Sequence, residues 1–337
     1  MKFSIIIPVR SINNFMKESI DHLKELDYAD FEVLIVSDST ETFDFKNDTR
    51  FRIISSGPMG PGEKRNLGAK QATGDILVFL DDDAYPKSDW LTKAAEAFNS
   101  TDTYALGAPA VTPLNATFKE RCSGRVLESF LTSAGTRYRH IPMKRKFVND
   151  YPTVNLFVKK EAFDRVGGFI KEFWPGEDTK LCLDLLKYYK RPFLYDPAPI
   201  VYHHRRELFL PHLKQISRYG MHRGQFARIF PETSRNLSYF IPSLFVIGFV
   251  FGWLSIFINQ YLFYIYCAVV LIYIVAIHAE GFRIAITDKD LKEAAPVHMG
   301  IALTHFVYGI NFIIGIIKRP TLKLRSFDEK TGNYLGG

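Results

Sequence analysis

The sequence predicts an α/β protein with a mostly parallel sheet, helices on both faces of the sheet, and membrane helices at its C-terminal end. Two apolar β-rich segments, residues 3–9 and 31–37, flank a stretch with helical spacing of its apolar residues. Strand, helix and strand in this order form the unit of a parallel sheet covered on both faces. Residues 237–258 and 261–279 contain no Asp, Glu, Lys or Arg, and each run can cross the ~30 Å hydrocarbon core. We therefore expect a sheet domain over residues 1–230 and a membrane region over residues 231–337.

The most informative stretch of the sheet domain is an apolar segment that runs directly into Asp81, Asp82 and Asp83. A buried parallel strand presents its carboxyl end at the ligand-binding edge of the sheet. Alternation along an extended chain points Asp81 and Asp83 to one side and Asp82 to the other. Adjacent carboxylates repel one another, and hard oxygen ligands suit Mg²⁺ or Mn²⁺ that carries phosphates. The stretch predicts a metal site, with a solvated acidic turn as the alternative.

Two further segments carry polar residues at predicted strand or helix ends. Asp38 follows the strand at residues 31–37, where it is either a turn acid or a ligand contact. A loop rich in Gly and Pro, residues 57–62, leads into a helix with Lys64 and Arg65 in its first turn. Basic residues beside such a loop suit a diphosphate, with solvated surface charge as the alternative.

Glu177 and Asp178 follow Gly176 and open another predicted helix. We expect Asp178 at the N-cap of this helix, where the helix dipole and the free N–H groups keep a carboxylate ionised. Simple helix capping is the alternative role for this residue.

Composition and charge narrow the class of protein. The three cysteines, Cys122, Cys182 and Cys267, are odd in number and far apart, which argues against a disulfide framework or a zinc site and indicates a reducing compartment. The short apolar run at the N-terminus predicts a first strand rather than a signal peptide. The net charge of +7 is concentrated between residues 203 and 235, with seven basic residues against two acids. Such a patch faces phosphates or a membrane surface, and no nucleic-acid motif accompanies it.

The two uncharged runs are expected to form a tight membrane hairpin over residues 237–279, because only Asn259 and Gln260 separate them. Both flanks of a hairpin lie on one side, and the basic segment before it marks that side as cytoplasmic. A third apolar stretch, residues 297–317, ends in Lys318 and Arg319. If this stretch crossed the membrane, these charges would lie outside, so we expect an interfacial or re-entrant helix and a short polar tail.

Taken together, these motifs resemble those of family-2 glycosyltransferases of the GT-A fold, of the membrane-attached bacterial and archaeal kind. The resemblance covers about the first 230 residues, and the GT-A fold is Rossmann-like. Six segments carry the resemblance, in the order of the family: Ile5-Ile6-Ile7-Pro8-Val9, Val36-Ser37-Asp38-Ser39, Lys64-Arg65-Asn66-Leu67-Gly68, Leu80-Asp81-Asp82-Asp83, Gly176-Glu177-Asp178-Thr179 and Val201-Tyr202-His203.

The resemblance implies a role for each matching residue. Asp178 would be the general base, with Glu177 beside it, and Asp83 would ligate the metal together with Asp81 and His203, for which His204 is the alternative. Pro8 and Val9 would line the base pocket, Asp38 would accept from the base, and Arg65 would steady base or phosphate. The full set expected to bind the nucleotide sugar is Pro8, Val9, Arg10, Asp38, Lys64, Arg65, Asp81, Asp82, Trp174, Arg218 and Arg223.

The implied activity is an inverting transfer that depends on Mn²⁺ or Mg²⁺. The donor would be a nucleotide sugar, expected to be UDP-linked, and the acceptor a lipid-linked or cell-envelope glycan at the cytoplasmic face of the cell inner (plasma) membrane. Processive members carry a Gln-x-x-Arg-Trp motif, whereas this chain has Tyr219 in place of the Trp, so we expect transfer of a single sugar. Transfer to polyprenyl phosphate and a membrane-tethered nucleotide-sugar binder without turnover are the alternatives.

Overall fold

The computed structural model describes residues 1–40, 42–170, 176–288, 290–318, 326–328 and 333–335. The chain forms two compact units. Unit 1 comprises Met1–Val111, Ile141–His204 and the described part of the C-terminal tail, and unit 2 comprises Thr112–His140 and Arg205–Pro320. Unit 2 therefore contains a segment that interrupts unit 1 in the sequence.

Unit 1 is built on an eight-stranded sheet with the order β3-β2-β1-β4-β9-β6-β10-β8. Neighbouring strands are parallel from β3 to β4 and between β6 and β10, whereas β9 and β8 run antiparallel to their neighbours. The bounds are β1 Phe3–Val9, β2 Phe31–Ser37, β3 Phe51–Ser55, β4 Ile76–Leu80, β6 Ala105–Gly107, β8 Lys146–Val148, β9 Asn155–Lys159 and β10 Phe193–Tyr195.

Helices cover both faces of this sheet, as the apolar runs of the strands predict. All seven residues of β1 are buried. Ile5 and Ile7 belong to a core with apolar residues of α1 and α3, whereas Ile6 faces α2, where Gly68 leaves no room for a side chain. Unit 1 contains the helices α1 Asn14–Lys24, α2 Pro61–Gln71, α3 Trp90–Ser100, α6 Lys160–Arg165 and α7 Glu177–Tyr189. The predicted α/β fold with a mostly parallel sheet is confirmed.

A second, three-stranded sheet of unit 1 has the order β5-β11-β7, with bounds β5 Ala84–Pro86, β7 Ala110–Val111 and β11 Val201–His203. The antiparallel pairing of β11 with β5 places His203 opposite Ala84, next to the acidic run. Two further short strands, β12 Ser326–Asp328 and β13 Asn333–Leu335, pair with each other in the tail.

Unit 2 is helical. Its helices are α4 Phe118–Glu128, α5 Phe130–Ser133, η1 Ala134–Arg139, α8 Leu210–Ile229, α9 Pro231–Ser234, α10 Leu237–Phe251, η2 Gly252–Phe257, α11 Gln260–Asp288, η3 Leu291–Glu293 and α12 Ala294–Ile317. The interrupting segment is anchored within this unit, because Cys122 and Val126 of α4 share a core with residues of α11 and α12. Arg121 also donates to Glu293 at 2.9 Å.

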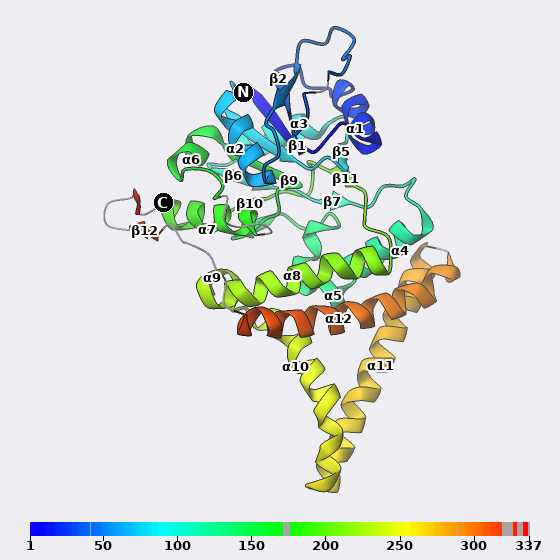
Figure 1. Cartoon of the computed structure of the whole chain (residues 1–337). Coiled ribbons are helices and arrows are strands. Elements are labelled where there is room, and N and C mark those ends of the chain that lie inside the picture. The colour runs from blue at the N-terminus through cyan, green and yellow to red at the C-terminus, as the bar shows by residue number, and fades with distance from the viewer. Residues whose placement is uncertain (41, 171–175, 289, 319–325, 329–332, 336–337) are drawn as a thin grey trace. The chain divides into compact units, whose positions relative to one another are not determined.

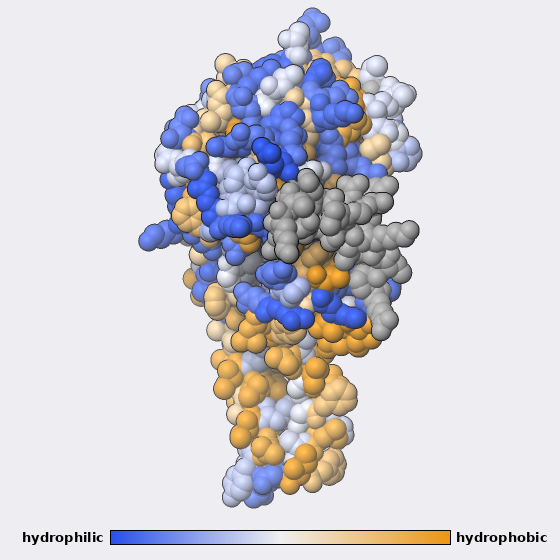
Figure 2. Space-filling view, turned by 90° about the vertical axis from the view of Figure 1, so that its left-hand side faces the viewer, coloured by the Kyte–Doolittle hydropathy of each residue, from blue (hydrophilic) through white to orange (hydrophobic). Residues whose placement is uncertain are grey.

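The predicted membrane hairpin forms in unit 2. Helix α10 and η2 run to residue 257, and α11 returns from residue 260, so the turn lies at Asn259 as expected (Figure 1). Apolar side chains cover the outside of the hairpin, which is largely orange in Figure 2. Three helical stretches, Leu237–Phe257, Gln260–Thr287 and Leu291–Ile317, are long and apolar enough to cross a membrane.

Candidate active site

The carboxyl ends of β1, β2 and β4 lie at one edge of the sheet, because these strands are parallel neighbours. Lys64, in the first turn of α2, joins two of them. Its Nζ lies 2.5 Å from the Asp38 carboxylate and donates to the carbonyl oxygen of Val9 at 2.5 Å. Val9 and Asp38, expected at the nucleobase, are thus brought together with Lys64, expected at the diphosphate. Pro8 is buried within β1, and Arg10 is exposed.

The acidic run gathers a group of possible metal ligands. One ligand atom each from Asp81, Asp83 and His203 lies within 4.8 Å of the others, and His203 Nε2 lies 3.1 Å from Asp83 Oδ1. Asp82 points away from this group and accepts from the Asn13 amide at 3.1 Å. Asp81 and Asp83 therefore lie together as expected, although the chain turns here instead of staying extended, because the Ala84 N–H donates to the Asp81 carbonyl oxygen at 3.2 Å.

The adjacent histidines separate in the same way. His204 Nε2 lies 2.8 Å from Glu18 of α1, so His203 and not His204 joins the acids. Two carboxylates and one imidazole are a donor set that fits a divalent cation such as Mn²⁺ or Mg²⁺. Asp81 and His203 are only partly buried, which leaves room for further oxygen ligands.

Arg65 connects the metal-ligand group with the start of α7. Its side chain is 4% exposed, Nη2 donates to Asp81 at 2.8 Å, and Nη1 donates to Glu177 at 2.9 Å. The guanidinium also lies over the Phe169 ring, 5.6 Å from its centre. Burial acts to lower the pKa of Arg65, but the nearby carboxylates of Asp81, Glu177 and Asp178 outweigh burial and hold this pKa above its ordinary value.

Helix α7 begins at Glu177, with Gly176 as its N-cap at φ 122°. The expectation that Asp178 is the N-cap is therefore wrong: the chain enters α7 through a positive φ at position 176, which favours Gly, and Asp178 lies in the first turn. Glu177 is buried against Arg65 and also accepts from the Gly176 N–H at 3.1 Å. Asp178 is half-buried and accepts from the Thr179 N–H at 2.7 Å. Asp178 is the more accessible carboxylate of the two.

Comparison with known proteins identifies the segment that carries Asp38, Lys64, Arg65, Asp81 and Asp83 of this site. Residues 4–167 match the sequence model of the family described as Glycosyl transferase family 2. The chain carries a family-2 glycosyltransferase domain. The resemblance drawn from the six motifs is confirmed.

Two relatives extend the match beyond this domain. The chain is 28% identical over 212 residues to a pre-mycofactocin glycosyltransferase of Mycobacterium tuberculosis, which covers 61% of this chain and 43% of the relative. It is 26% identical over 186 residues to the glycosyltransferase AglE of Haloferax volcanii, which covers 52% of this chain and 58% of the relative. The chain thus spans about half the length of these relatives.

A solved structure matches almost the whole chain. The mannosyltransferase PcManGT from Pyrobaculum calidifontis, in complex with GDP-Man and Mn²⁺, is 18% identical with a TM-score of 0.52. The match covers 94% of this chain and 87% of PcManGT. At this level of identity the likeness shows the fold, and it confirms the GT-A fold of the glycosyltransferase domain.

Two of the expected nucleotide-sugar contacts belong to unit 2, and the placement of a third is not described. Trp174 lies outside the described residues. Arg218 and Arg223 belong to α8 of unit 2, where Arg218 is exposed and Arg223 packs over the Tyr239 ring at 4.9 Å. Their contact with the nucleotide stays a prediction.

Sequence reasoning missed the residues that contact Asp82, His204 and Arg65 and hold these side chains in place. The Asn13 side chain caps α1 by accepting from the Met16 N–H at 2.9 Å, and its amide also donates to Asp82 at 3.1 Å. Glu18 orients His204, and Phe169 lies beneath Arg65. Asn13 can be recognised as a helix cap from the sequence. Its contact with Asp82, and that of Glu18 with His204, join residues far apart in the sequence, and no local pattern predicts them.

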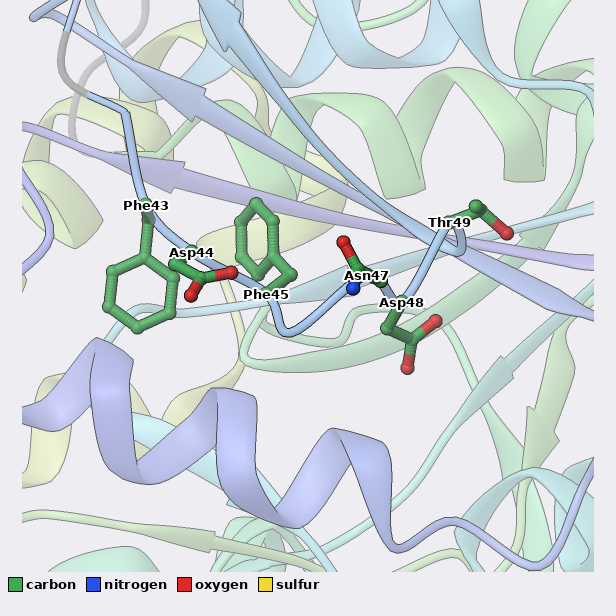
Figure 3. A pocket seen from close by; sticks show the side chains of 6 residues that line it. All are labelled: Phe43, Asp44, Phe45, Asn47, Asp48 and Thr49. Carbon is green, nitrogen blue, oxygen red and sulfur yellow. The ribbon is translucent and has the colours of Figure 1, made fainter.

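A hollow of about 340 Å³ lies elsewhere in unit 1, in the loop between β2 and β3 (Figure 3). Phe43 and Phe45 line it together with Asp44 and Asp48. Both acids are engaged locally, because Asp44 accepts from Lys46 N–H and Asp48 pairs with Arg50. None of the residues that line this hollow belongs to the metal-ligand group or to the start of α7.

Proposed function

We propose that the chain is an inverting, metal-dependent glycosyltransferase that moves one sugar from a nucleotide-sugar donor to a lipid-linked or envelope glycan acceptor. The observation that carries the proposal is the Arg65 bridge. It joins a carboxylate of the metal-ligand group to the helix turn that presents Asp178, so the donor-binding and proton-accepting groups belong to one connected set.

In this proposal Asp178 accepts the proton of the acceptor hydroxyl as that oxygen attacks the anomeric carbon and the bond to the diphosphate breaks. Glu177 holds Arg65 and the start of α7 in place rather than taking the proton itself. A divalent cation bound by Asp81, Asp83 and His203 would stabilise the negative charge of the leaving diphosphate. Attack opposite the leaving group inverts the anomeric centre.

The donor pocket has a base end and a phosphate end. Pro8, Val9, Asp38 and Lys64 form the base end, where Lys64 fixes Asp38 and leaves its other oxygen to accept from a nucleobase. UDP remains the expected nucleotide of the donor. Because PcManGT binds GDP-Man, a guanine donor belongs in the same test.

The membrane hairpin supports an acceptor that is held at the membrane. Basic residues cluster before α10, and α11 returns the chain to the same side as that cluster, which by the positive-inside tendency is the cytoplasmic side. Arg218 and Arg223 would then lie near the membrane surface as further phosphate contacts. Tyr219 is exposed and accepts from Gln215 at 3.0 Å, and in place of the Trp of processive enzymes it favours a single transfer.

The test is calorimetric binding of UDP, GDP, CDP and TDP to the detergent-purified chain, with and without Mn²⁺. We expect one nucleotide to bind only with metal, and Asp83→Ala to abolish this binding. Asp102→Ala, at a carboxylate that is 82% exposed, is the matched control and should bind as the wild type does. If no nucleotide shows metal-dependent binding, the role of the acidic run is refuted and a lipid-linked donor becomes the better hypothesis.

The base is tested separately with Asp178→Asn. Release of nucleoside diphosphate in the presence of a membrane lipid extract should fall by at least 10²-fold, the usual range for a general base, while nucleotide binding stays unchanged. Unchanged turnover would disprove the base assignment, and binding without turnover in the wild type would favour the non-catalytic binder. Polyprenyl phosphate as sole acceptor would favour the polyprenyl-phosphate alternative.

A further inference from the structure

Helices α8 and α12 of unit 2 run side by side in the same direction (Figure 1). His212 bonds to Thr304 at 3.0 Å near the start of the pair. Arg228 donates to the carbonyl oxygen of Ile316 at 2.7 Å near its end. The partners advance together along both chains, so the two helices are parallel and in contact over about three to four turns, roughly 18–24 Å at 1.5 Å per residue.

Helices α8 and α12 pack so closely that glycines of one helix lie against the backbone of the other. A Cβ added to Gly220 would lie 2.6 Å from the carbonyl oxygen of Tyr308. One added to Gly224 would meet the backbone of Phe312, and one added to Gly315 would meet the backbone of Met221. Small residues at such a seam allow the closest helix contact that proteins form. The two helices must therefore share one depth and one tilt in any membrane.

Helix α8 is too charged to lie in hydrocarbon. Lys214, Arg218 and Arg228 are exposed along its length, and Arg223 is half-buried. Charged side chains are costly at the bilayer centre unless they face protein or water. If α12 crossed the membrane, the backbone contacts would carry these residues of α8 across with it.

The outer face of α12, by contrast, is apolar. Met299, Ile310, Ile314 and Ile317 are 52%, 45%, 41% and 73% exposed, and their spacing places them on one side of the helix. Another side of α12 receives the hairpin, through Ser243 of α10 and through residues 273–282 of α11. Those contacts come from the hairpin ends that lie nearest to the basic segment.

We propose that α12 lies in the membrane interface beside α8 and does not cross, although its length and hydropathy would allow a crossing. Its outer face then contacts the boundary between headgroups and acyl chains, while α8 keeps its charges at the headgroups. The occupant of the outer face is the lipid of the same bilayer that the hairpin crosses, since α10 and α11 both contact α12 and themselves expose apolar side chains. The proposal rests on membrane insertion of the hairpin and does not depend on the glycosyltransferase activity.

The test places single cysteines at both ends of α12 in a Cys267→Ser background, in which Cys122 and Cys182 are buried. Lys292→Cys and Lys318→Cys are a matched pair of exposed positions, and Ile258→Cys, 77% exposed, marks the hairpin turn. A membrane-impermeant maleimide is added to intact cells and to permeabilised cells, with full reactivity verified in SDS.

We expect intact cells to label only Ile258→Cys, and permeabilisation to raise labelling of both Lys positions at least 10-fold. Labelling of Lys318→Cys but not Lys292→Cys from outside would show that α12 crosses and would overturn the proposal. Labelling of all three positions from one side would also overturn it, because the hairpin itself would not be inserted.

A second measurement separates an interfacial helix from one that dips into the bilayer and returns. Nitroxides attached through Met299→Cys, Ile310→Cys and Ile317→Cys report depth by their relative access to oxygen and to a water-soluble nickel complex. An interfacial helix predicts similar shallow depths, about 5–10 Å below the headgroups. A middle position much deeper than both ends would refute the interfacial arrangement.

Discussion

Replacing Arg65 with Met is expected to destabilise unit 1 by about 3 kcal/mol. Removal of one member of a buried ion pair leaves its partner charged and unpaired, which costs about 3–5 kcal/mol. The lower end of this range applies because Asp81 is 31% exposed and water can solvate it, whereas Glu177 is only 9% exposed. The unpaired Glu177 carboxylate therefore accounts for most of the loss, together with the packing of Arg65 on Phe169.

The assay is a double-mutant cycle with Glu177→Gln, read from urea unfolding of the detergent-solubilised chain. Trp90 is fully buried in the core of unit 1, so its fluorescence reports this unit in a Trp174→Phe, Trp253→Phe background. We expect Glu177→Gln alone to cost about 1–3 kcal/mol, because the Arg65 guanidinium loses a charged acceptor.

The double variant should cost at least about 1 kcal/mol less than the sum of the single variants, because it leaves no unpaired buried carboxylate at position 177. Arg65→Lys is the matched control, since it keeps the charge but cannot reach both acids with a rigid fork, and it should fall between wild type and Arg65→Met. Additivity within about 0.5 kcal/mol would refute the bridge between the metal-ligand group and α7.

Three further predictions concern pH, helix packing and metal. Burial lowers the pKa of His212 to about 4, so below pH 6.5 the unfolded chain binds a proton that the folded chain does not. The free energy of unfolding of unit 2 should therefore fall by about 1.4 kcal/mol between pH 7.5 and 5.5. In thermal melts, His212→Asn should reduce this dependence of stability on pH. Gly220→Ala should cost about 1–3 kcal/mol because its Cβ meets the backbone of α12, whereas Gly248→Ala meets nothing within 4 Å and should melt as the wild type does. Removal of metal with EDTA should abolish nucleotide binding as completely as Asp83→Ala, and added Mn²⁺ should restore it in the wild type alone; binding that survives EDTA would contradict a metal-held diphosphate.

Local sequence patterns predicted the parts of the site that depend on one strand or one helix. Alternation predicted that Asp81 and Asp83 lie together and that Asp82 points away, and the structure reaches this arrangement through a turn at residues 81–84. Which histidine joins depends on how β11 pairs with β5, and this register between distant segments is not visible in the local pattern.

The role of Arg65 could not be predicted for the same reason. Its partner Glu177 lies 112 residues away in the sequence. A basic residue in the first turn of a helix does not by itself predict a buried carboxylate partner. The N-cap expected at Asp178 lies two residues earlier, because Gly176 takes the cap with a positive φ.

The division into units was also hidden from the sequence. Periodicity fades and basic residues accumulate over residues 109–152, which predicted a less regular insert with acceptor-facing loops. Within this stretch the chain forms α4, α5 and η1, and apolar residues of α4 share a core with helices near the C-terminus. The acceptor role of this segment stays a prediction, as does a functional boundary near residue 230.

The partnership between α4 and the C-terminal helices sets an order of events during synthesis. Arg121 pairs with Glu293, which emerges 172 residues later, and at about 5–20 residues per second this delay is roughly 10–30 s. The last strand of the unit 1 sheets ahead of the tail, β11, is complete at His203, well before α12 is made. During that interval Cys122 and Val126 of α4 stay exposed, because the residues of α11 and α12 that bury them have not yet been made. A nascent chain halted before α12 should therefore hold a folded catalytic sheet and an uncovered apolar helix, which makes it a substrate for chaperones and proteases rather than a working enzyme.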